Sequence, residues 1–223
     1  MFENLEGIVS LLWASIEIVL LVNVMIFAEK NSVNKMLMLL IFFLFSYQLL
    51  EFMICYVGLT SSIWVYFAFV LLSLLPPIGV LTVLTIIGKR NKYSIFLFLP
   101  PMFFAVYYPF VLGQMNVTLC TILFADYSYP LGDLYGVFYY LPIAATIYLM
   151  IIELKKDIGR KAKRNIGLLL SGYLFSSLSP FVFVLFFPPI ISYIESFLCK
   201  FALFLAVAAS IFALLNKTEK TTK

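Results

Sequence analysis

Four ionisable residues lie inside long hydrophobic runs and are the side chains best suited to chemistry: Glu17, Glu51, Glu195 and Lys200. A lone Lys at the centre of a bilayer costs about 2.5–3.5 kcal/mol on insertion scales, so such charges usually face protein or trapped water. At a helical rise of about 1.5 Å per residue, all four fall in the outer half or near the midplane of their predicted spans. We therefore predict that they line a polar site inside a helix bundle.

Lys200 is predicted to pair with a carboxylate from another helix. Glu195 lies five positions before it, which is about 140° around a helix, whereas side chains pair along one helix at spacings of three or four. A helical Lys leans toward the N-terminus of its helix, which brings the ammonium close to the depth of Glu51. The sequence therefore predicts a pair between Lys200 and Glu51, with Glu17 as the alternative partner.

Tyr47, Gln48 and Glu51 share one helix face through spacings of three and four residues. This face is polar within an otherwise apolar run, so we predict that it forms one wall of the site. A structural ion-pair network that only fixes helix packing is the alternative interpretation. The predicted ligand-binding set is Tyr47, Gln48, Glu51, Glu17, Glu195 and Lys200.

The composition defines the solvent of this chain and excludes several chemistries. Hydrophobic residues make up 64% of its 223 residues and charged residues 12%, against about 45–50% and about 25% in soluble domains. The absence of His excludes His-ligated zinc, Ser-His and Cys-His triads and imidazole proton relays. Three scattered cysteines are too few for a disulfide framework or a thiolate metal site. We predict an integral membrane protein that is not an enzyme, holds no metal and binds no nucleic acid.

Hydrophobic runs of about 18 or more residues predict membrane-spanning helices. The chain then forms one all-α domain over residues 1–223, a seven-transmembrane-helix bundle located in the cell membrane as a multi-pass protein. The predicted helices cover residues 8–28, 36–57, 62–88, 94–112, 135–154, 166–187 and 190–215.

The basic residues predict the orientation of the bundle. Every Lys and Arg except Lys200 falls in the first, third or fifth connection or in the C-terminal tail. Cytoplasmic loops retain such residues during insertion, so the N-terminus is expected outside and the C-terminus in the cytoplasm. The fifth connection, from Lys155 to Arg164, is predicted to be a loop that contacts anionic lipid headgroups.

The fourth connection, residues 113–134, is the long external one in this topology. Its run NVTLCTILFADY, residues 116–127, is apolar enough to lie on the bundle or in the membrane interface as a lid. Tyrosines gather near the same surface, which is typical of an aromatic belt, and a ligand vestibule is the alternative. The tyrosines concerned are Tyr107, Tyr108, Tyr127, Tyr129, Tyr135, Tyr139 and Tyr140.

Two short motifs resemble a group of small microbial seven-helix membrane proteins without an established activity. The run YQLLE at residues 47–51 is similar to that group's Q-x-x-E in helix two, and SFLC at 196–199 to its Ser-x-Trp-Cys in helix seven. Leu198 stands at the position of the Trp, and Lys200 has no counterpart in the pattern. The resemblance implies a seven-helix architecture and points to Gln48, Glu51 and Cys199, but it implies no reaction.

Three functions are compatible with these residues. A small-molecule or signal receptor comes first, with the charged site outside and output through a cytoplasmic partner protein, because no catalytic domain is expected after the last helix. A small-solute or proton-coupled transporter is the second, although the prolines crowd into helices three to six without a repeat. A retinal protein is the third, because Lys200 could form a Schiff base, with Glu51 as counterion since the third span holds no acid.

Overall fold

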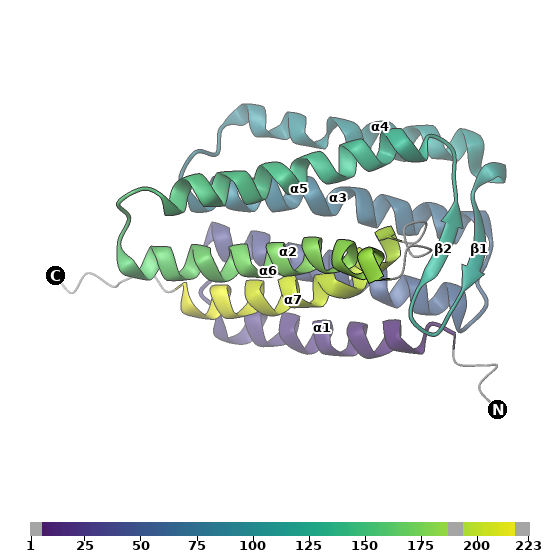
Figure 1. The fold of residues 1–223 in the computed structure, drawn as a ribbon, viewed down its shortest axis with the longest axis horizontal. Helices are drawn as coiled ribbons and strands as arrows, with labels where there is room; N and C mark the ends of the chain where they lie inside the picture. Colours follow the sequence, from purple (N-terminus) through teal and green to yellow (C-terminus); the bar gives the residue numbers. More distant parts are fainter. Residues whose placement is uncertain (1–5, 187–193, 217–223) are drawn as a thin grey trace.

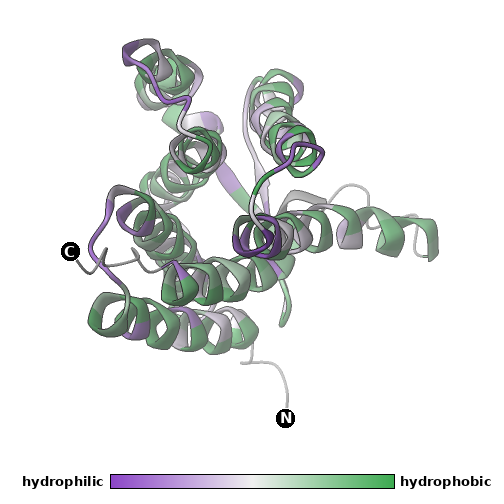
Figure 2. Cartoon of the chain, turned by 90° about the vertical axis from the view of Figure 1, so that its left-hand side faces the viewer, coloured by the Kyte–Doolittle hydropathy of each residue, from purple (hydrophilic) through white to green (hydrophobic). Residues whose placement is uncertain are grey.

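The computed structural model describes residues 6–186 and 194–216, and the side chains of residues 194–196 are outside this description. Seven segments of the described chain are helical, long and apolar enough to cross a membrane, which confirms the predicted number. They run along the long axis of the molecule (Figure 1). In Figure 2 most residues along these helices have the colour of hydrophobic residues.

The helices follow the predicted runs closely, with a small two-stranded sheet between the fourth and fifth spans. The first three are α1 (Ile8–Phe27), α2 (Ser32–Cys55) and α3 (Ser62–Ile86). The fourth span consists of η1 (Lys92–Phe98), α4 (Leu99–Tyr107) and η2 (Tyr108–Gln114), and strands β1 (Asn116–Cys120) and β2 (Ala125–Ser128) follow it. The remaining helices are α5 (Gly132–Leu154), α6 (Arg160–Phe186) and α7 (Ile194–Leu215).

The two ends of the bundle differ in their connections, and we name them accordingly. The hairpin end carries β1 and β2 together with the start of α1 and the end of α2 (Figure 1). The basic end carries the connections from α1 to α2, α3 to η1 and α5 to α6, and these contain the Lys and Arg residues that lie between the spans.

Two boundaries differ from the prediction. The fourth span is not a continuous α-helix, because Pro100, Pro101 and Pro109 lack the N–H that a helix interior requires, and 3₁₀ segments flank the short α4. The predicted fifth loop is also wrong in extent, because α6 already begins at Arg160. Lys and Arg are good helix formers, so the helix continues beyond the apolar run that marks the span.

The predicted lid of the fourth connection is an antiparallel hairpin in the structure. Its register runs from Asn116 opposite Ser128 to Cys120 opposite Ala125. The Thr121 hydroxyl organises the turn, because it accepts hydrogen bonds from the backbone N–H of Phe124 at 2.9 Å and of Leu123 at 3.2 Å.

The hairpin is attached to two helices of the bundle. A disulfide joins Cys120 of β1 to Cys55 at the end of α2, with the two Cα atoms 5.5 Å apart. At the turn, the carbonyl of Thr121 accepts a hydrogen bond from the N–H of Gly7, just before α1, at 2.8 Å. The hairpin therefore covers the ends of α1 and α2 rather than extending away from the bundle.

Two hydrophobic cores fill the interior. The core toward the basic end is mainly aliphatic and includes buried alanines of α7, such as Ala206, Ala209 and Ala213. Gly172 of α6 allows α7 to approach closely, because a Cβ at this position would lie 2.6 Å from the Cβ of Ala208. The core toward the hairpin end is rich in aromatic side chains and includes Tyr47, Phe69, Phe104, Tyr108, Tyr135 and Tyr139.

Candidate functional site

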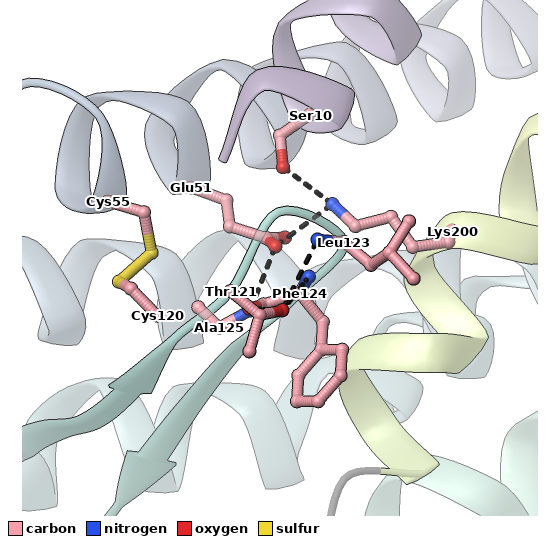
Figure 3. Close-up of a disulfide and its surroundings, with 9 residues drawn as sticks. All are labelled: Ser10, Glu51, Cys55, Cys120, Thr121, Leu123, Phe124, Ala125 and Lys200. Atoms are coloured by element: carbon pink, nitrogen blue, oxygen red, sulfur yellow. Dashed lines mark hydrogen bonds and ion pairs between the residues drawn. A yellow bond between two sulfur atoms is a disulfide. The ribbon is translucent and has the colours of Figure 1, made fainter. Parts of the chain in front are cut away.

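The ammonium of Lys200 lies at the centre of a polar cluster between α1, α2 and α7 (Figure 3). Its Nζ is 2.9 Å from Glu51 Oε1, and it donates hydrogen bonds to Ser10 Oγ at 2.7 Å and to Gln48 Oε1 at 2.8 Å. An ammonium has three protons and no acceptor, so these three contacts use its full donating capacity. The predicted ion pair between Lys200 and Glu51 is confirmed.

These groups are almost entirely removed from solvent. The exposed fraction is 0% for Ser10 and Glu51, 1% for Gln48 and 9% for Lys200. Removing one partner of a buried ion pair leaves an uncompensated charge and typically costs about 3–5 kcal/mol. The cluster therefore couples three helices through contacts that are almost closed to solvent.

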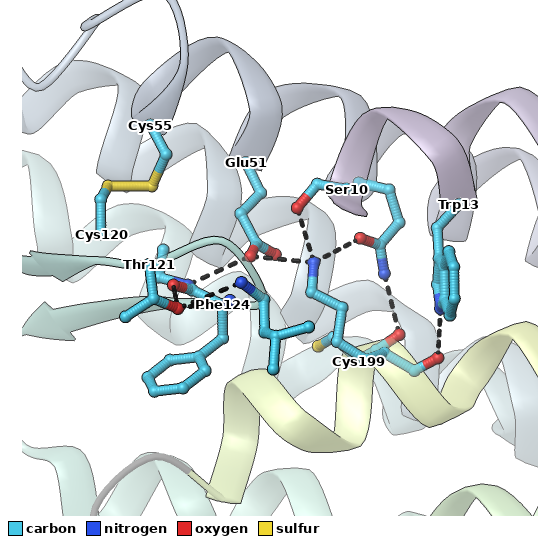
Figure 4. Close-up of polar contacts among 12 residues, drawn as sticks. Ser10, Trp13, Glu51, Cys55, Cys120, Thr121, Phe124 and Cys199 are labelled. Carbon is cyan, nitrogen blue, oxygen red and sulfur yellow. Dashed lines mark hydrogen bonds and ion pairs between the residues drawn. A yellow bond between two sulfur atoms is a disulfide. The ribbon is translucent and has the colours of Figure 1, made fainter. Parts of the chain in front are cut away.

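Backbone carbonyls of α7 strengthen the attachment of Lys200 to its neighbours (Figure 4). Gln48 Nε2 donates to the carbonyl of Cys199 at 2.8 Å, so the amide of Gln48 uses one end for the ammonium and the other for the helix that carries it. Trp13 Nε1 donates to the carbonyl of Lys200 itself at 2.7 Å. α1 and α2 thus hold both the side chain and the backbone of residue 200.

The hairpin reaches the ion pair directly. The backbone N–H of Ala125, the first residue of β2, donates to Glu51 Oε1 at 3.1 Å, and this is the same oxygen that contacts Lys200. Phe124 beside it packs against Phe197 of α7, with ring centroids 5.0 Å apart. One carboxylate oxygen therefore joins the hairpin, α2 and α7.

Tyr127 of β2 adds a neutral phenol to this region. Burial, together with the nearby Glu51 carboxylate, raises the pKa of Tyr127 well above its usual range. The phenol therefore stays protonated at physiological pH and contributes a dipole rather than a charge.

The remaining predicted site residues have different positions. Tyr47 is buried in the aromatic core and is not one of the three contacts of the ammonium. Glu17 of α1 is 0% exposed, and its carboxylate interacts electrostatically with Lys200 but has no hydrogen-bond partner among the described residues. The side chain of Glu195 lies outside the described residues. The ligand-binding role of this set stays a prediction.

Several residues of the cluster were missed from the sequence. Ser10 lies on the same face of α1 as Glu17, seven residues away. This spacing could have indicated that Ser10 belongs to the cluster. Trp13 and Ala125 act through an indole N–H and a backbone N–H, for which the sequence gives no signal. The cysteines were predicted to be too few for a disulfide framework, yet Cys55 and Cys120 form one disulfide. The available indication was that Cys55 lies at the end of the second predicted span and Cys120 in the connection predicted to be external.

Two of the cavities among the described residues are lined by neither Glu51 nor Lys200. One of about 40 Å³ lies between α2, α3, α5, α6 and α7 and is lined by Leu40, Leu44, Leu75, Pro76, Tyr139, Ile143, Tyr173, Ser176, Ser177, Leu198, Ala202 and Leu205. A groove of about 550 Å³ on α6 and α7 is lined mostly by apolar side chains, including Leu174, Phe175, Val182 and Phe201. A site of about 10–15 Å³ holds one water, so the first can be hydrated.

A metal site and a retinal Schiff base would each require particular side chains in this cluster. No cluster of three His, Cys, Asp or Glu side chains that could hold a metal occurs among the described residues. A protonated Schiff base at Lys200 would keep one N–H donor and so lose two of the three contacts described above. The retinal and transporter alternatives stay predictions, and adding retinal and recording a visible spectrum tests the first of them.

Comparisons with protein-family models, curated proteins and solved structures found no match to this chain. The resemblance to the small microbial seven-helix group therefore stays a prediction.

Proposed function

We propose that this chain is a receptor-type membrane sensor with its hairpin end outside the cell and its basic end in the cytoplasm. The distribution of Lys and Arg supports this orientation. The disulfide between Cys55 and Cys120 supports it independently, because disulfides form and persist in oxidising compartments outside the cytosol.

The observation that carries the proposal is the shared oxygen of Glu51. The N–H of Ala125 and the ammonium of Lys200 both contact Glu51 Oε1. A displacement of the hairpin therefore changes the hydrogen bonding of the Glu51 carboxylate, and Lys200 in turn joins α7 to α2 through Glu51 and to α1 through Ser10. An external event at the hairpin can reach the bundle through this contact without entering it.

The alternative is a structural lock, in which the ion pair only fixes helix packing. The two interpretations differ in how far a change at the hairpin travels. A sensor transmits it to the basic end, where residues 155–164 offer a charged surface to a cytoplasmic partner. A lock confines it to the hairpin end.

Amide hydrogen exchange of the protein in nanodiscs tests this difference. The double variant Cys55→Ser, Cys120→Ser removes the covalent link between the hairpin and α2, and we expect faster exchange in residues 155–164 as well as in the hairpin. Leu72→Ala is the matched control, because Leu72 is buried in the same aromatic-rich core but makes none of the contacts of the ion pair. Faster exchange at the hairpin end alone would contradict the sensor and favour the lock.

A further inference from the structure

The cluster around Lys200 contains three buried carboxylate oxygens that no donor of the described chain reaches. Both carboxylate oxygens of Glu17 and the Oε2 atom of Glu51 have no hydrogen-bond partner within the described part of the chain. All three protons of the ammonium are used by Ser10, Gln48 and Glu51. Buried polar atoms are normally hydrogen-bonded, so three unsatisfied oxygens in one cluster require an explanation.

The formal charges show the same imbalance. Glu51 contacts the ammonium of Lys200 directly, whereas Glu17 is a second fully buried carboxylate that only a longer-range electrostatic interaction links to Lys200. Burying an unpaired charge costs several kcal/mol unless the group is neutralised. Neutralising the second carboxylate therefore requires one positive charge that also supplies a hydrogen-bond donor.

The space around the cluster restricts what can supply that charge. Glu17 and Glu51 are both 0% exposed, so bulk solvent does not reach either carboxylate. A metal ion requires additional oxygen ligands at fixed distances, and no three-residue acidic or thiol group is available among the described residues. A proton needs no space, and it converts a carboxylate oxygen from an acceptor into a donor.

We infer that the Glu17–Lys200–Glu51 cluster is a proton-binding site, taking up one proton on its two carboxylates. This inference rests on the proposed sensor function for its biological meaning and deepens it, because it identifies the hydrogen ion as the ligand. Uptake at Glu51 weakens its hold on both Lys200 and Ala125, whereas uptake at Glu17 removes the second carboxylate charge. Either event changes the cluster that the hairpin contacts.

Other ionisable groups face the same cluster and have to be separated from it. These groups are Tyr47 of α2, the thiol of Cys199 in α7, and Tyr127 and Asp126 of the hairpin. The carboxylate of Asp126 accepts a hydrogen bond from the hydroxyl of Thr118. Phenols and thiols do not give the infrared band of a protonated carboxyl group. A measurement of that band therefore isolates Glu17 and Glu51 from most of their neighbours.

Infrared difference spectroscopy of the protein in nanodiscs during a pH titration is the experiment. We expect a C=O stretch of a buried carboxylic acid that corresponds to about one proton per chain. This band should be lost in Glu17→Gln or Glu51→Gln and kept in Asp133→Asn, an exposed carboxylate at the hairpin end. Glu17→Asp retains the acid and should retain a band, which separates loss of the proton site from loss of the fold.

Two results would overturn the inference. The first is that no carboxylic-acid band depends on Glu17 or Glu51 at any pH at which the protein stays folded. The second is that sodium or potassium abolishes the band at constant pH, which would assign the site to a metal cation. A band without any hydrogen-exchange response in residues 155–164 would instead leave the proton site intact and contradict the sensor alone.

Discussion

Two buried polar networks join α2 to α7, one at each end of the bundle, and they use different chemistry. At the basic end the network is neutral. Asn34 Nδ2 donates to the carbonyls of Glu29 at 2.8 Å and Ala213 at 3.2 Å, while its Oδ1 accepts from Asn216 at 3.0 Å. At the hairpin end the network is charged and centres on Lys200.

In the neutral network the hydrogen-bonding groups of Asn34 all have partners, which suits a role in helix packing. Asn34 uses both of its amide protons and its carbonyl oxygen, and its backbone N–H is held by the side chain of Asn31, the N-cap of α2. An amide network of this kind fixes the packing of α2 against α7 without the cost of burying charge.

In the charged network, by contrast, some hydrogen-bond acceptors have no donor among the described residues. It leaves Oε2 of Glu51 and both oxygens of Glu17 without partners in the described chain. Since neutral amides already join the same two helices at the other end, packing alone does not account for burying a Lys and two carboxylates. This contrast is the basis on which we propose a role in transmission for the charged network.

The largest expected effect is loss of one member of the ion pair. Lys200→Met and Glu51→Gln should each lower the free energy of unfolding in detergent by about 3–5 kcal/mol, because each removes the direct ion-pair partner of a buried group. The double variant should recover much of that loss. Thermal unfolding of the four proteins gives the coupling energy, and strictly additive losses would show that Lys200 and Glu51 act independently.

The disulfide should have the next largest effect. The variant Cys55→Ser, Cys120→Ser removes a link across a sequence separation of 65 residues, and such links typically contribute about 2–4 kcal/mol. Reducing the wild-type protein should give the same shift in unfolding temperature, and reductant should then leave the double variant unchanged. A reductant effect that persists in the double variant would assign it to Cys199 instead.

The sequence predicts the charged network better than the neutral one. A Lys within an apolar run demands a partner, and helix depth and side-chain direction were enough to select Glu51 and, through its shared face, Gln48. Asn34 and Asn216 lie beside the ends of spans, where polar residues are expected in any case, so nothing distinguished them. The spans themselves were predictable because hydrophobic length is a direct requirement of the bilayer.

The position of the hairpin over the bundle was predictable, but its strands, register and disulfide were not. Its apolar residues indicated contact with the bundle, whereas its register and its disulfide depend on distances that the sequence does not contain. The contact of Ala125 with Glu51 is made by a backbone N–H, which every residue except proline possesses. This is why the feature that connects the hairpin to the ion pair could only be found in three dimensions.

The neutral network should be less sensitive to substitution than the charged one. Asn34→Ala leaves two carbonyls and the Asn216 amide without their partner, and we expect a loss of about 1–3 kcal/mol in the free energy of unfolding with no change in its pH dependence. Asn23→Ala is the control, because Asn23 is exposed on α1 and bonds only within its own helix. A loss as large as that of Lys200→Met would remove the contrast between the two networks.

The smallest expected effect concerns the surface of the basic end. Lys155, Lys156, Arg160, Lys163 and Arg164 are all exposed there, and each basic residue near an anionic membrane surface gains about 1 kcal/mol. Part of this gain is already used, because Lys156 forms an ion pair with Glu153. We therefore expect nanodiscs with phosphatidylglycerol to raise the unfolding temperature modestly relative to purely zwitterionic nanodiscs.

The double variant Lys163→Gln, Arg164→Gln should reduce that rise, because it removes two of these exposed basic residues. Both lie in the first turns of α6 rather than in a free loop. Asp133→Asn at the hairpin end should leave it unchanged. The effect should also weaken as salt is added, since exposed charges are screened over about 10 Å at 0.1 M ionic strength. The buried pair of Lys200 and Glu51 is screened far less, so its coupling energy should persist under the same salt. If both effects fell together with salt, the two ends of the bundle would not differ electrostatically in the way that their burial implies.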